Sequence, residues 1–408
     1  MSTVRPFKAV RPAEGLESSI AALPYDVFKR YEAREYVKDK PLSFLNIDRA
    51  ETHFDDDVDT YDERVYLKAR EIYDGMLERG EFIRDEKPFF YLYEQTMDGR
   101  TQTGLVCTAS VSEYDNNIIL KHENTLREKE QDRINHIKAL NAQTGPIFLA
   151  YRDKGLLKDL FAKIKSSDPY ASFKDHDVLQ RLWVISDPAD ISFIQDMFLS
   201  VSNLYIADGH HRCASACRVC HELPDDAGDE KNYFLSVIFP DSELMIMDYN
   251  RLVKDLNGYT AETFLDAISD RFDVTERENN DEKPARKGDI YMFLEGKSYV
   301  LNLKSEYLKN DPIGVLDVSV LQDNLLDPVL NIKNPKEDPR IDFVGGIRGI
   351  KGLKERLDKD CTVAFAMYPT SMSELFAVAD AHMLMPPKST WFEPKLLSGL
   401  FIHELIDK

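Results

Sequence analysis

Residues 205–216 read Tyr-Ile-Ala-Asp-Gly-His-His-Arg-Cys-Ala-Ser-Ala, and they predict a strand, a tight turn and a helix in direct succession. Residues 204–206 are apolar, as in a short buried strand, and Asp208-Gly209 is a turn signal. Two histidines and Arg212 then open a helix of small residues over 211–220. Unpaired N–H groups and the positive end of the helix dipole stabilise an anion at such a point. The alternative is an ordinary helix capped by Asp208, with packed or solvated histidines.

The chain as a whole is long enough to bury a large core. It has 408 residues, of which 43% are hydrophobic and 30% charged. Hairpins interleaved with helices, without a repeated strand-helix-strand pattern, predict an α+β fold with mixed sheets. We expect sub-domains at 1–115, 116–276 and 288–408, with the polar stretch around Asn279 and Asn280 as the main boundary loop.

Turn residues and hydrophobic periodicity predict the individual elements. The glycine cluster at 343–352 indicates a strand-turn-helix junction, not a nucleotide-binding loop. The predicted hairpins pair 89–95 with 101–110, 233–239 with 244–249, and 290–294 with 299–303. The predicted helices lie at 62–79, 128–142, 260–272, 315–326 and 372–381.

The charge balance argues against nucleic acid and membranes as partners. The sequence has 52 basic and 72 acidic residues and a formal charge of −20, which repels polyanions and acidic lipid surfaces. No apolar run approaches the length of a membrane span, and the first residues form no hydrophobic signal segment. We therefore expect a cytoplasmic protein whose ligands are small molecules; the oligomeric state is left open.

The cysteines predict reduced thiols. Five of them, an odd and scattered set, do not suit a disulfide framework. Cys213, Cys217 and Cys220 have a spacing that iron–sulfur or zinc sites also use. The same spacing places them on one face of a helix, where cysteine is an ordinary small core residue, and we favour that interpretation.

A second polar group precedes the helix predicted at 128–142. His122, Glu123 and Thr125 lie in the loop before it and offer a base, a metal ligand and a hydroxyl donor. Arg127 and Arg133 offer positive charge for phosphate. A capped helix with a charged outer face is the alternative.

Two further groups lie towards the C-terminus. Asn250 and Arg251 follow a predicted strand, where loops gather binding groups, although solvated surface charge is an alternative. A proline-stiffened loop carries Lys388, Ser389 and Thr390, with Lys395 after it. No glycine-rich nucleotide fingerprint is present, which suits a compact phosphate donor at least as well as a nucleotide.

Seven ordered blocks, spread over nearly the whole chain, resemble one family. The sequence is similar to a bacterial and protist group related to the ParB/sulfiredoxin superfamily, whose best understood relatives are kinases of free L-serine. The blocks are Pro24-Tyr-Asp-Val27, His122-Glu-x-Thr125 with Lys129-x2-Asp132-Arg133, Pro146-Ile-Phe148, Ala207-Asp-Gly-His-His-Arg212, Asn250-Arg-x2-Lys254-Asp-Leu256, Leu316-Asp-Val-Ser-Val-Leu321, and Pro386-Pro-Lys-Ser-Thr390 with Pro394-Lys-Leu396.

The resemblance implies a ParB/sulfiredoxin-like core and phosphoryl transfer to free L-serine, which gives O-phospho-L-serine. Pyrophosphate is the implied donor in long members, and ADP or ATP in shorter relatives. The resemblance also implies Mg²⁺ or another divalent cation as cofactor. Phosphoryl transfer of this kind depends on positioning and on neutralising charge.

The implied roles fall on matching positions of this chain. Asp208 is the expected base or Mg²⁺ ligand, Glu123 competes for both roles, and His211 completes the expected catalytic set. Lys388, Ser389 and Thr390 are expected to hold the rest of the donor. The remaining expected substrate- and phosphate-binding residues are Gly209, His210, Arg212, His122, Thr125, Arg127, Arg133, Asn250, Arg251 and Lys395.

Two other functions remain possible interpretations of the sequence. A ParB-like DNA-binding partition protein would need a basic helix-turn-helix, and the sequence shows none. A sulfiredoxin-like thiol enzyme would need a reactive cysteine at the helix start. Cys213 is near that place but follows the His-Arg pair, whereas the related reductases have their cysteine before it.

Overall fold

The computed structural model describes residues 1–278 and 281–406, and the chain forms two compact units. Unit 1 comprises Met1–Leu244 and Pro394–Lys408, and unit 2 comprises Met245–Glu393. The chain therefore divides after Leu244, whereas the sequence predicted divisions near 115 and at 276–288. Asn279 and Asn280 lie outside the described residues.

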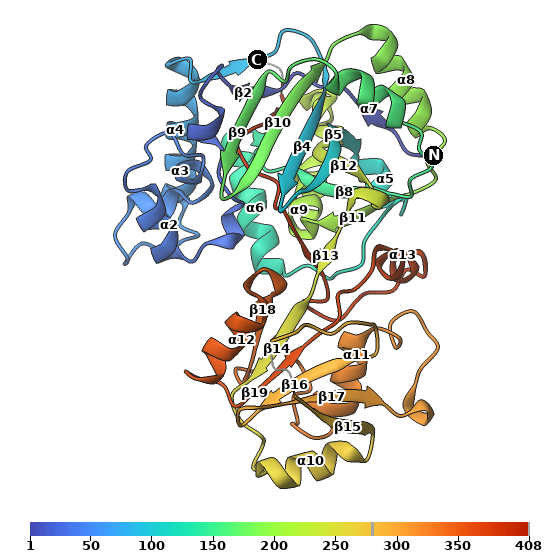
Figure 1. Ribbon diagram of the computed structural model, residues 1–408. Coiled ribbons are helices and arrows are strands. Elements are labelled where there is room, and N and C mark those ends of the chain that lie inside the picture. The colour runs from blue at the N-terminus through green and yellow to red at the C-terminus, as the bar shows by residue number, and fades with distance from the viewer. Residues whose placement is uncertain (279–280, 407–408) are drawn as a thin grey trace. The chain divides into compact units, whose positions relative to one another are not determined.

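Unit 1 is built on a large mixed sheet (Figure 1). Its strands from 1–115 and from 116–244 pair directly with one another, which is why those two segments form one compact unit. In spatial order the strands are β6 (Ile119–Leu120), β11 (Leu204–Asp208), β8 (Ile147–Tyr151), β12 (Tyr233–Pro240), β5 (Arg100–Ser110), β4 (Phe90–Met97), β10 (Val178–Ile185) and β9 (Ala171–Asp175), with β1 (Val4–Arg5) on β5.

Local turn chemistry predicted one hairpin of this sheet correctly and another wrongly. β4 and β5 meet at Asp98 and Gly99, whose φ angles of 51° and 77° suit a tight hairpin turn. The hairpin predicted around 240–243 does not form. Both edges of β12 are already taken by β5 and β8, and β13 (Ile246–Met247) pairs instead with β20 (Trp391–Phe392).

Helices cover the sheet and form the wall around the strand ends. α6 (Arg127–Leu140) packs against both α4 (Glu63–Glu78) and α9 (His210–Glu222). Asp62 caps the start of α4 with a carboxylate that accepts the Arg64 N–H, and the helix ends before Gly80, as its sequence predicted. The other helices of this unit are α1 (Glu17–Ile20), α2 (Arg30–Val37), α3 (Leu45–Asp48), α5 (Val111–Asp115), α7 (Lys158–Lys165) and α8 (Pro188–Phe198).

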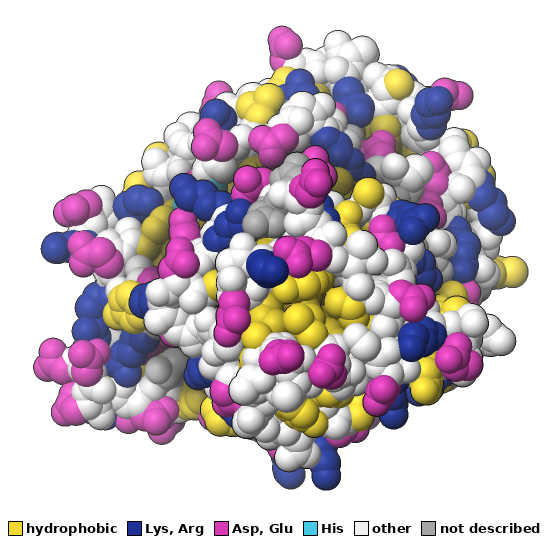
Figure 2. Space-filling model, turned by 60° about the horizontal axis from the view of Figure 1, so that its bottom comes forward, with side chains coloured by type: hydrophobic (Ala, Val, Ile, Leu, Met, Phe, Trp, Pro, Cys, Tyr) yellow, Lys and Arg dark blue, Asp and Glu magenta, His cyan; other side chains and the backbone are white. Residues whose placement is uncertain are grey.

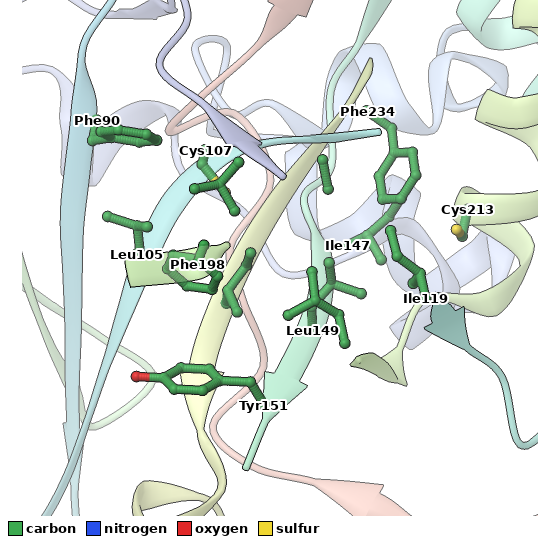
Figure 3. Packing of buried hydrophobic residues seen from close by; sticks show 14 of the residues in the cluster. Phe90, Leu105, Cys107, Ile119, Ile147, Leu149, Tyr151, Phe198, Cys213 and Phe234 are labelled. Atoms are coloured by element: carbon green, nitrogen blue, oxygen red, sulfur yellow. The ribbon is translucent and has the colours of Figure 1, made fainter. Parts of the chain in front are cut away.

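The core of unit 1 joins the sheet to α9. Figure 3 shows Ile147 and Leu149 of β8 among aromatic and aliphatic neighbours, with Cys213 of α9 facing the same cluster. Cys213 is fully buried, and it behaves as a small apolar core residue. This packing fixes the start of α9 against the ends of β8 and β11.

Unit 2 is smaller and combines an antiparallel sheet with helices (Figure 1). The predicted third hairpin forms, with Glu295 and Gly296 in its turn, and the helices predicted at 260–272, 315–326 and 372–381 are present in shorter form. The glycine cluster joins β18 (Ile341–Gly345) to α12 (Gly349–Leu357), as predicted. The sheet runs β15 (Phe272–Arg277), β17 (Lys297–Leu303), β16 (Ile290–Leu294), β19 (Val363–Ala366), β14 (Tyr249–Val253) and β18 (Ile341–Gly345), with α10 (Ala261–Ser269), α11 (Asp317–Leu321), α12 (Gly349–Leu357) and α13 (Met372–Asp380).

The architecture is consistent with the predicted α+β class. The large sheet of unit 1 is mixed, as predicted, whereas the strand pairs of the unit 2 sheet are all antiparallel. The ParB/sulfiredoxin-like core stays a prediction. Among the described residues, no helix combines the length and the apolar character that a membrane crossing needs.

We predict that Gly104→Ala destabilises unit 1. A Cβ at this position of β5 would lie 2.5 Å from Val237 Cγ1 and 2.6 Å from Phe239 Cζ, and both belong to the packed strand β12. Urea titration should show a loss of about 1–3 kcal/mol of unfolding free energy. The exposed substitution Thr101→Ala on the same strand should stay within about 0.5 kcal/mol of the parent protein. Equal losses in both variants would contradict this account of the packing.

Candidate functional site

The strand, turn and helix predicted from residues 205–216 form the centre of the candidate site. β11 ends at Asp208, after a bulge in its pairing with β8 between Ile206 and Asp208. Gly209 follows with φ 91°, a left-handed conformation that side chains disfavour, and α9 starts at His210. The first turn of α9 contains no acidic residue. Its N-terminus therefore keeps the positive end of the helix dipole available to an anion.

Arg212 connects three segments around this bend. Its Nη1 donates to the carbonyl oxygen of Pro146 at 2.5 Å, and its Nη2 donates to Asp208 Oδ2 at 3.2 Å. A Cβ on Gly209 would lie 3.0 Å from the guanidinium, so the glycine also provides room for the arginine. Lys395 Nζ lies 3.8 Å from the same Asp208 oxygen. Two cationic groups thus meet at one carboxylate beside the helix N-terminus.

His210 is a buried and neutral member of the site. Burial, followed by the neighbouring His122, lowers the pKa of His210 well below its ordinary value. Its Nε2 accepts the backbone N–H of His122 at 3.4 Å, which places the ring proton on Nδ1. The two rings stand edge to face with centroids 4.5 Å apart. His210 therefore contributes a positioned donor and not a positive charge.

His211 is tied to the loop that carries the second predicted group. Its Nε2 accepts the backbone N–H of Leu126 at 2.9 Å. The loop closes on itself because the Thr125 hydroxyl donates to Glu130. Glu123 is half-buried in this loop, and Arg127 is exposed in the first turn of α6. The structure thus brings the His122–Thr125 group next to the histidines of α9.

Arg133 belongs to a buried charge network. Its Nε and Nη2 both lie 2.8 Å from Asp132 Oδ2, and its guanidinium lies over the Tyr25 ring, 4.0 Å from the centroid. The Tyr66 hydroxyl donates to the other oxygen of Asp132 at 2.9 Å. Asp132 holds Arg133 in place, with its Nη1 directed towards Asp48 at 3.9 Å.

This network lines two cavities of unit 1. The smaller one, about 30 Å³, reaches the Arg212 side chain. The larger one, about 210 Å³, lies towards α4. They share Tyr25, Asp48, Arg133 and His136 as wall residues. The predicted site set omitted Tyr25, Asp48 and His136. Only Tyr25 had a sequence signal, in the block Pro24–Val27.

The remaining predicted residues belong to unit 2. Arg251 is buried, and burial lowers its pKa to about 10. It donates to the Lys388 carbonyl at 3.0 Å and so supports the proline-stiffened loop. Asn250 is used internally, since its Oδ1 accepts the Met367 N–H at 2.9 Å. Ser389 Oγ donates to the Pro386 carbonyl at 2.7 Å, while Thr390 is half-buried in the loop.

Lys388 differs from its neighbours in this loop. Its side chain is exposed, with Nζ 5.6 Å from the centroid of the Tyr249 ring, and its φ angle of 59° is left-handed. The loop therefore presents a cation to solvent on a backbone that Arg251 holds. The predicted set is thus divided, with Asp208 and its neighbours in unit 1 and Asn250, Arg251 and Lys388–Thr390 in unit 2.

The cysteine alternatives gain no support from the structure. The Cys213 thiol and burial together raise the pKa of Cys217 well above its ordinary value, which disfavours a reactive thiolate. Within residues 1–278 and 281–406, no group of three or more His, Cys, Asp or Glu side chains could hold a metal ion. A Mg²⁺ ion at Asp208 would therefore need oxygens from a bound phosphate and water, as Mg²⁺ commonly does.

The face shown in Figure 2 has no continuous basic surface among the described residues that could bind nucleic acid. Acidic and basic side chains are interspersed there among the described residues, around an apolar area. Together with the formal charge of −20, this mixture disfavours a phosphate-backbone binding surface on that face.

The sequence places the chain in a family whose description assigns no function. The family model described as protein of unknown function (DUF1015) matches residues 4–319, and the chain belongs to this family. Among curated proteins, none matches the chain.

Solved structures show distant similarity. A mutant free serine kinase in complex with AMP has 13% identity, covers 71% of this chain and 87% of its own, and has a TM-score of 0.37. SbnI with a C-terminal truncation, from Staphylococcus aureus, has 13% identity, 72% and 85% coverage, and a TM-score of 0.39. A conserved hypothetical protein from Pyrococcus furiosus has 16% identity, 72% and 94% coverage, and a TM-score of 0.34. Similarity at this level gives no basis for transferring an activity.

We predict an acid-dependent loss of stability from the buried histidines. Burial lowers the pKa of His122 and of His136 to about 4. The unfolded chain takes up these protons near pH 6.5, while the folded protein does so only near pH 4. The free energy of unfolding should therefore fall as the pH drops through this window, by about 1.4 kcal/mol per pH unit for each histidine.

The variant His136→Gln tests this linkage. Glutamine retains a donor for the Ile47 carbonyl, which His136 Nε2 meets at 3.3 Å, but takes up no proton. Urea titrations at pH 6.5 and 4.5 should show a pH-dependent loss smaller by about 2 kcal/mol than in the parent protein. Titrations at pH 8 report the packing effect separately. An unchanged pH dependence would contradict the assignment.

Proposed function

We propose that this protein transfers a phosphoryl group from pyrophosphate to the hydroxyl of free L-serine and so forms O-phospho-L-serine. The observation that carries the proposal is the Asp208-Gly209 bend. There the N-terminus of α9, the fork of Arg212 and the Lys395 ammonium converge beside one carboxylate. The same bend lies within the sequence blocks that resemble free serine kinases. ADP or ATP as donor is the alternative form of the proposal.

The proposed reaction uses these groups in a simple way. The serine oxygen forms a bond to phosphorus, the bond from phosphorus to the bridging oxygen of pyrophosphate breaks, and orthophosphate leaves. Asp208 or Glu123 takes the hydroxyl proton of serine. The first-turn amides of α9 and Arg212 neutralise charge on the transferred group, because fixed donors and cations stabilise developing negative charge.

The histidines have a separate part in the proposal. The backbone N–H groups of His122 and Leu126 hold Nε2 of His210 and His211, which leaves Nδ1 of each ring as the donor position. Donors of fixed orientation suit in-line positioning of a phosphate better than mobile charges do. A Mg²⁺ ion held by Asp208 and phosphate oxygens would supply further charge neutralisation.

The direct test is a donor screen with the purified protein. L-serine and Mg²⁺ are mixed with pyrophosphate, ADP or ATP, and O-phosphoserine is measured by mass spectrometry. We expect product with pyrophosphate. Absence of product with all three donors would overturn the proposal. Product with ATP or ADP but not with pyrophosphate would show that the nucleotide is the donor.

The variant Asp208→Asn tests the site within that assay. Loss of the carboxylate should lower kcat/KM by about 100-fold or more, since it removes the partner of Arg212 together with a candidate base. Asp187→Asn is a matched control. Asp187 also stands at a strand-to-helix junction of unit 1, where it caps α8 by accepting the Ala189 N–H at 2.8 Å. Activity of Asp208→Asn equal to that of the control would contradict the assignment.

A further inference from the structure

Asp48 is a buried carboxylate at the wall of both cavities. It ends the short helix α3 and is 5% exposed. Its Oδ1 accepts the Thr144 hydroxyl at 3.1 Å. Two basic groups lie farther from the same oxygen, Arg133 Nη1 at 3.9 Å and His136 Nε2 at 3.7 Å. Neither is within hydrogen-bond distance.

The basic neighbours of Asp48 are committed elsewhere. Arg133 directs two of its nitrogens to Asp132 at 2.8 Å. His136 approaches the Ile47 carbonyl at 3.3 Å, and burial keeps its pKa at about 4, so the ring is neutral near pH 7. The group formed by Asp48, Asp132, Arg133 and His136 therefore carries two negative charges and one positive charge, and the further cation on the cavity wall, Arg212, is paired with Asp208. Arg133 is thus an ion-pair partner of Asp48 at 3.9 Å but not a hydrogen-bond donor to it, and a buried carboxylate that no cation hydrogen-bonds is costly.

The cavity beside Asp48 is small, and its wall combines apolar and polar side chains. Ser398 and Arg212 contribute to the wall of the part that measures about 30 Å³, room for about two water-sized groups. Ser398 is 2% exposed, so its hydroxyl is part of a buried wall. The larger cavity of about 210 Å³ shares Asp48 as a wall residue. A small charged head group fits the smaller cavity.

A primary ammonium group matches this environment. It brings one positive charge and three donors, and Asp48, Thr144 and Ser398 offer acceptor oxygens. A metal ion fits less well, because the described residues contain no group of three or more acidic, histidine or cysteine side chains that could hold one.

We propose that Asp48 binds the α-ammonium group of the amino-acid substrate. The inference rests on the proposed function, and it assigns the recognition of a free amino group to this cavity. Arg212 lines the cavity and also donates to Asp208, so one side chain separates the ammonium subsite from the phosphate site. The subsite selects free amino acids over hydroxy acids and over compounds whose amino group is acylated.

The test compares L-serine with 3-hydroxypropionate, which is serine without its amino group. Calorimetry with the full-length protein should show that serine binds about 10- to 100-fold more tightly, as expected for a charge-assisted hydrogen bond to a buried carboxylate. Asp48→Asn, which keeps the size of the side chain, should reduce this preference to about 3-fold or less. Thr144→Val, which removes the hydroxyl partner of Asp48, provides a second variant with a smaller reduction in the same direction.

Asp26→Asn is the matched control. Asp26 also lines the larger cavity but is exposed, and its substitution should leave the preference unchanged. Equal binding of serine and 3-hydroxypropionate to the parent protein would overturn the subsite, and so would a full preference retained in Asp48→Asn. Absence of binding by either compound would overturn it as well. Serine binding that depends on Asp48 without phosphoryl transfer from any donor would leave the subsite standing and remove the proposed reaction.

Discussion

The contacts of Arg212 with Asp208 and with the Pro146 carbonyl are the interaction on which the rest of the site depends. They tie the end of β11, the start of β8 and the first turn of α9 to one guanidinium. Gly209 makes this possible, because its left-handed conformation turns the chain while leaving room for the arginine. Cys213, one residue further along the helix, anchors the same turn in the core. The position of the helix N-terminus is therefore set by packing on one side and by charge on the other.

Around the Asp208-Gly209 bend, neutral, positively charged and negatively charged side chains lie in different places. His210 is neutral and lies next to the bend, held by the backbone N–H of His122, while Arg212 and Lys395 supply the positive charge. Beyond Arg212, the cavity wall carries Asp48, whose ion-pair partner Arg133 lies 3.9 Å away, outside hydrogen-bond distance. The proposed ligands differ in charge too, because a phosphoryl donor carries negative charge and the amino group of an amino acid carries positive charge. The arrangement therefore offers distinct places for an oxyanion and for an ammonium group within one unit.

The sequence predicted those parts of the fold that short-range chemistry controls. The Asp98-Gly99 and Glu295-Gly296 turns form hairpins because their left-handed residues suit the turn wherever the strands lie. The hairpin at 240–243 failed because β12 finds partners far away in sequence on both edges. For the same reason the return of Pro394–Lys408 to unit 1 had no local signal. Within the site, Asp208 to Arg212 form a local pattern and could be found. Asp48 could not be found in this way, because its hydrogen-bond partner Thr144 lies 96 residues away in the sequence.

The central claim is that the start of α9 binds an oxyanion of a phosphoryl donor, and the most direct measurement is a crystal structure with pyrophosphate soaked in. The account predicts a phosphate oxygen within hydrogen-bond distance of Arg212 and of a first-turn amide of α9, with Asp208 beside it. Pyrophosphate bound elsewhere in the protein, with the Asp208-Gly209 bend covered by protein or facing away from it, would contradict the account.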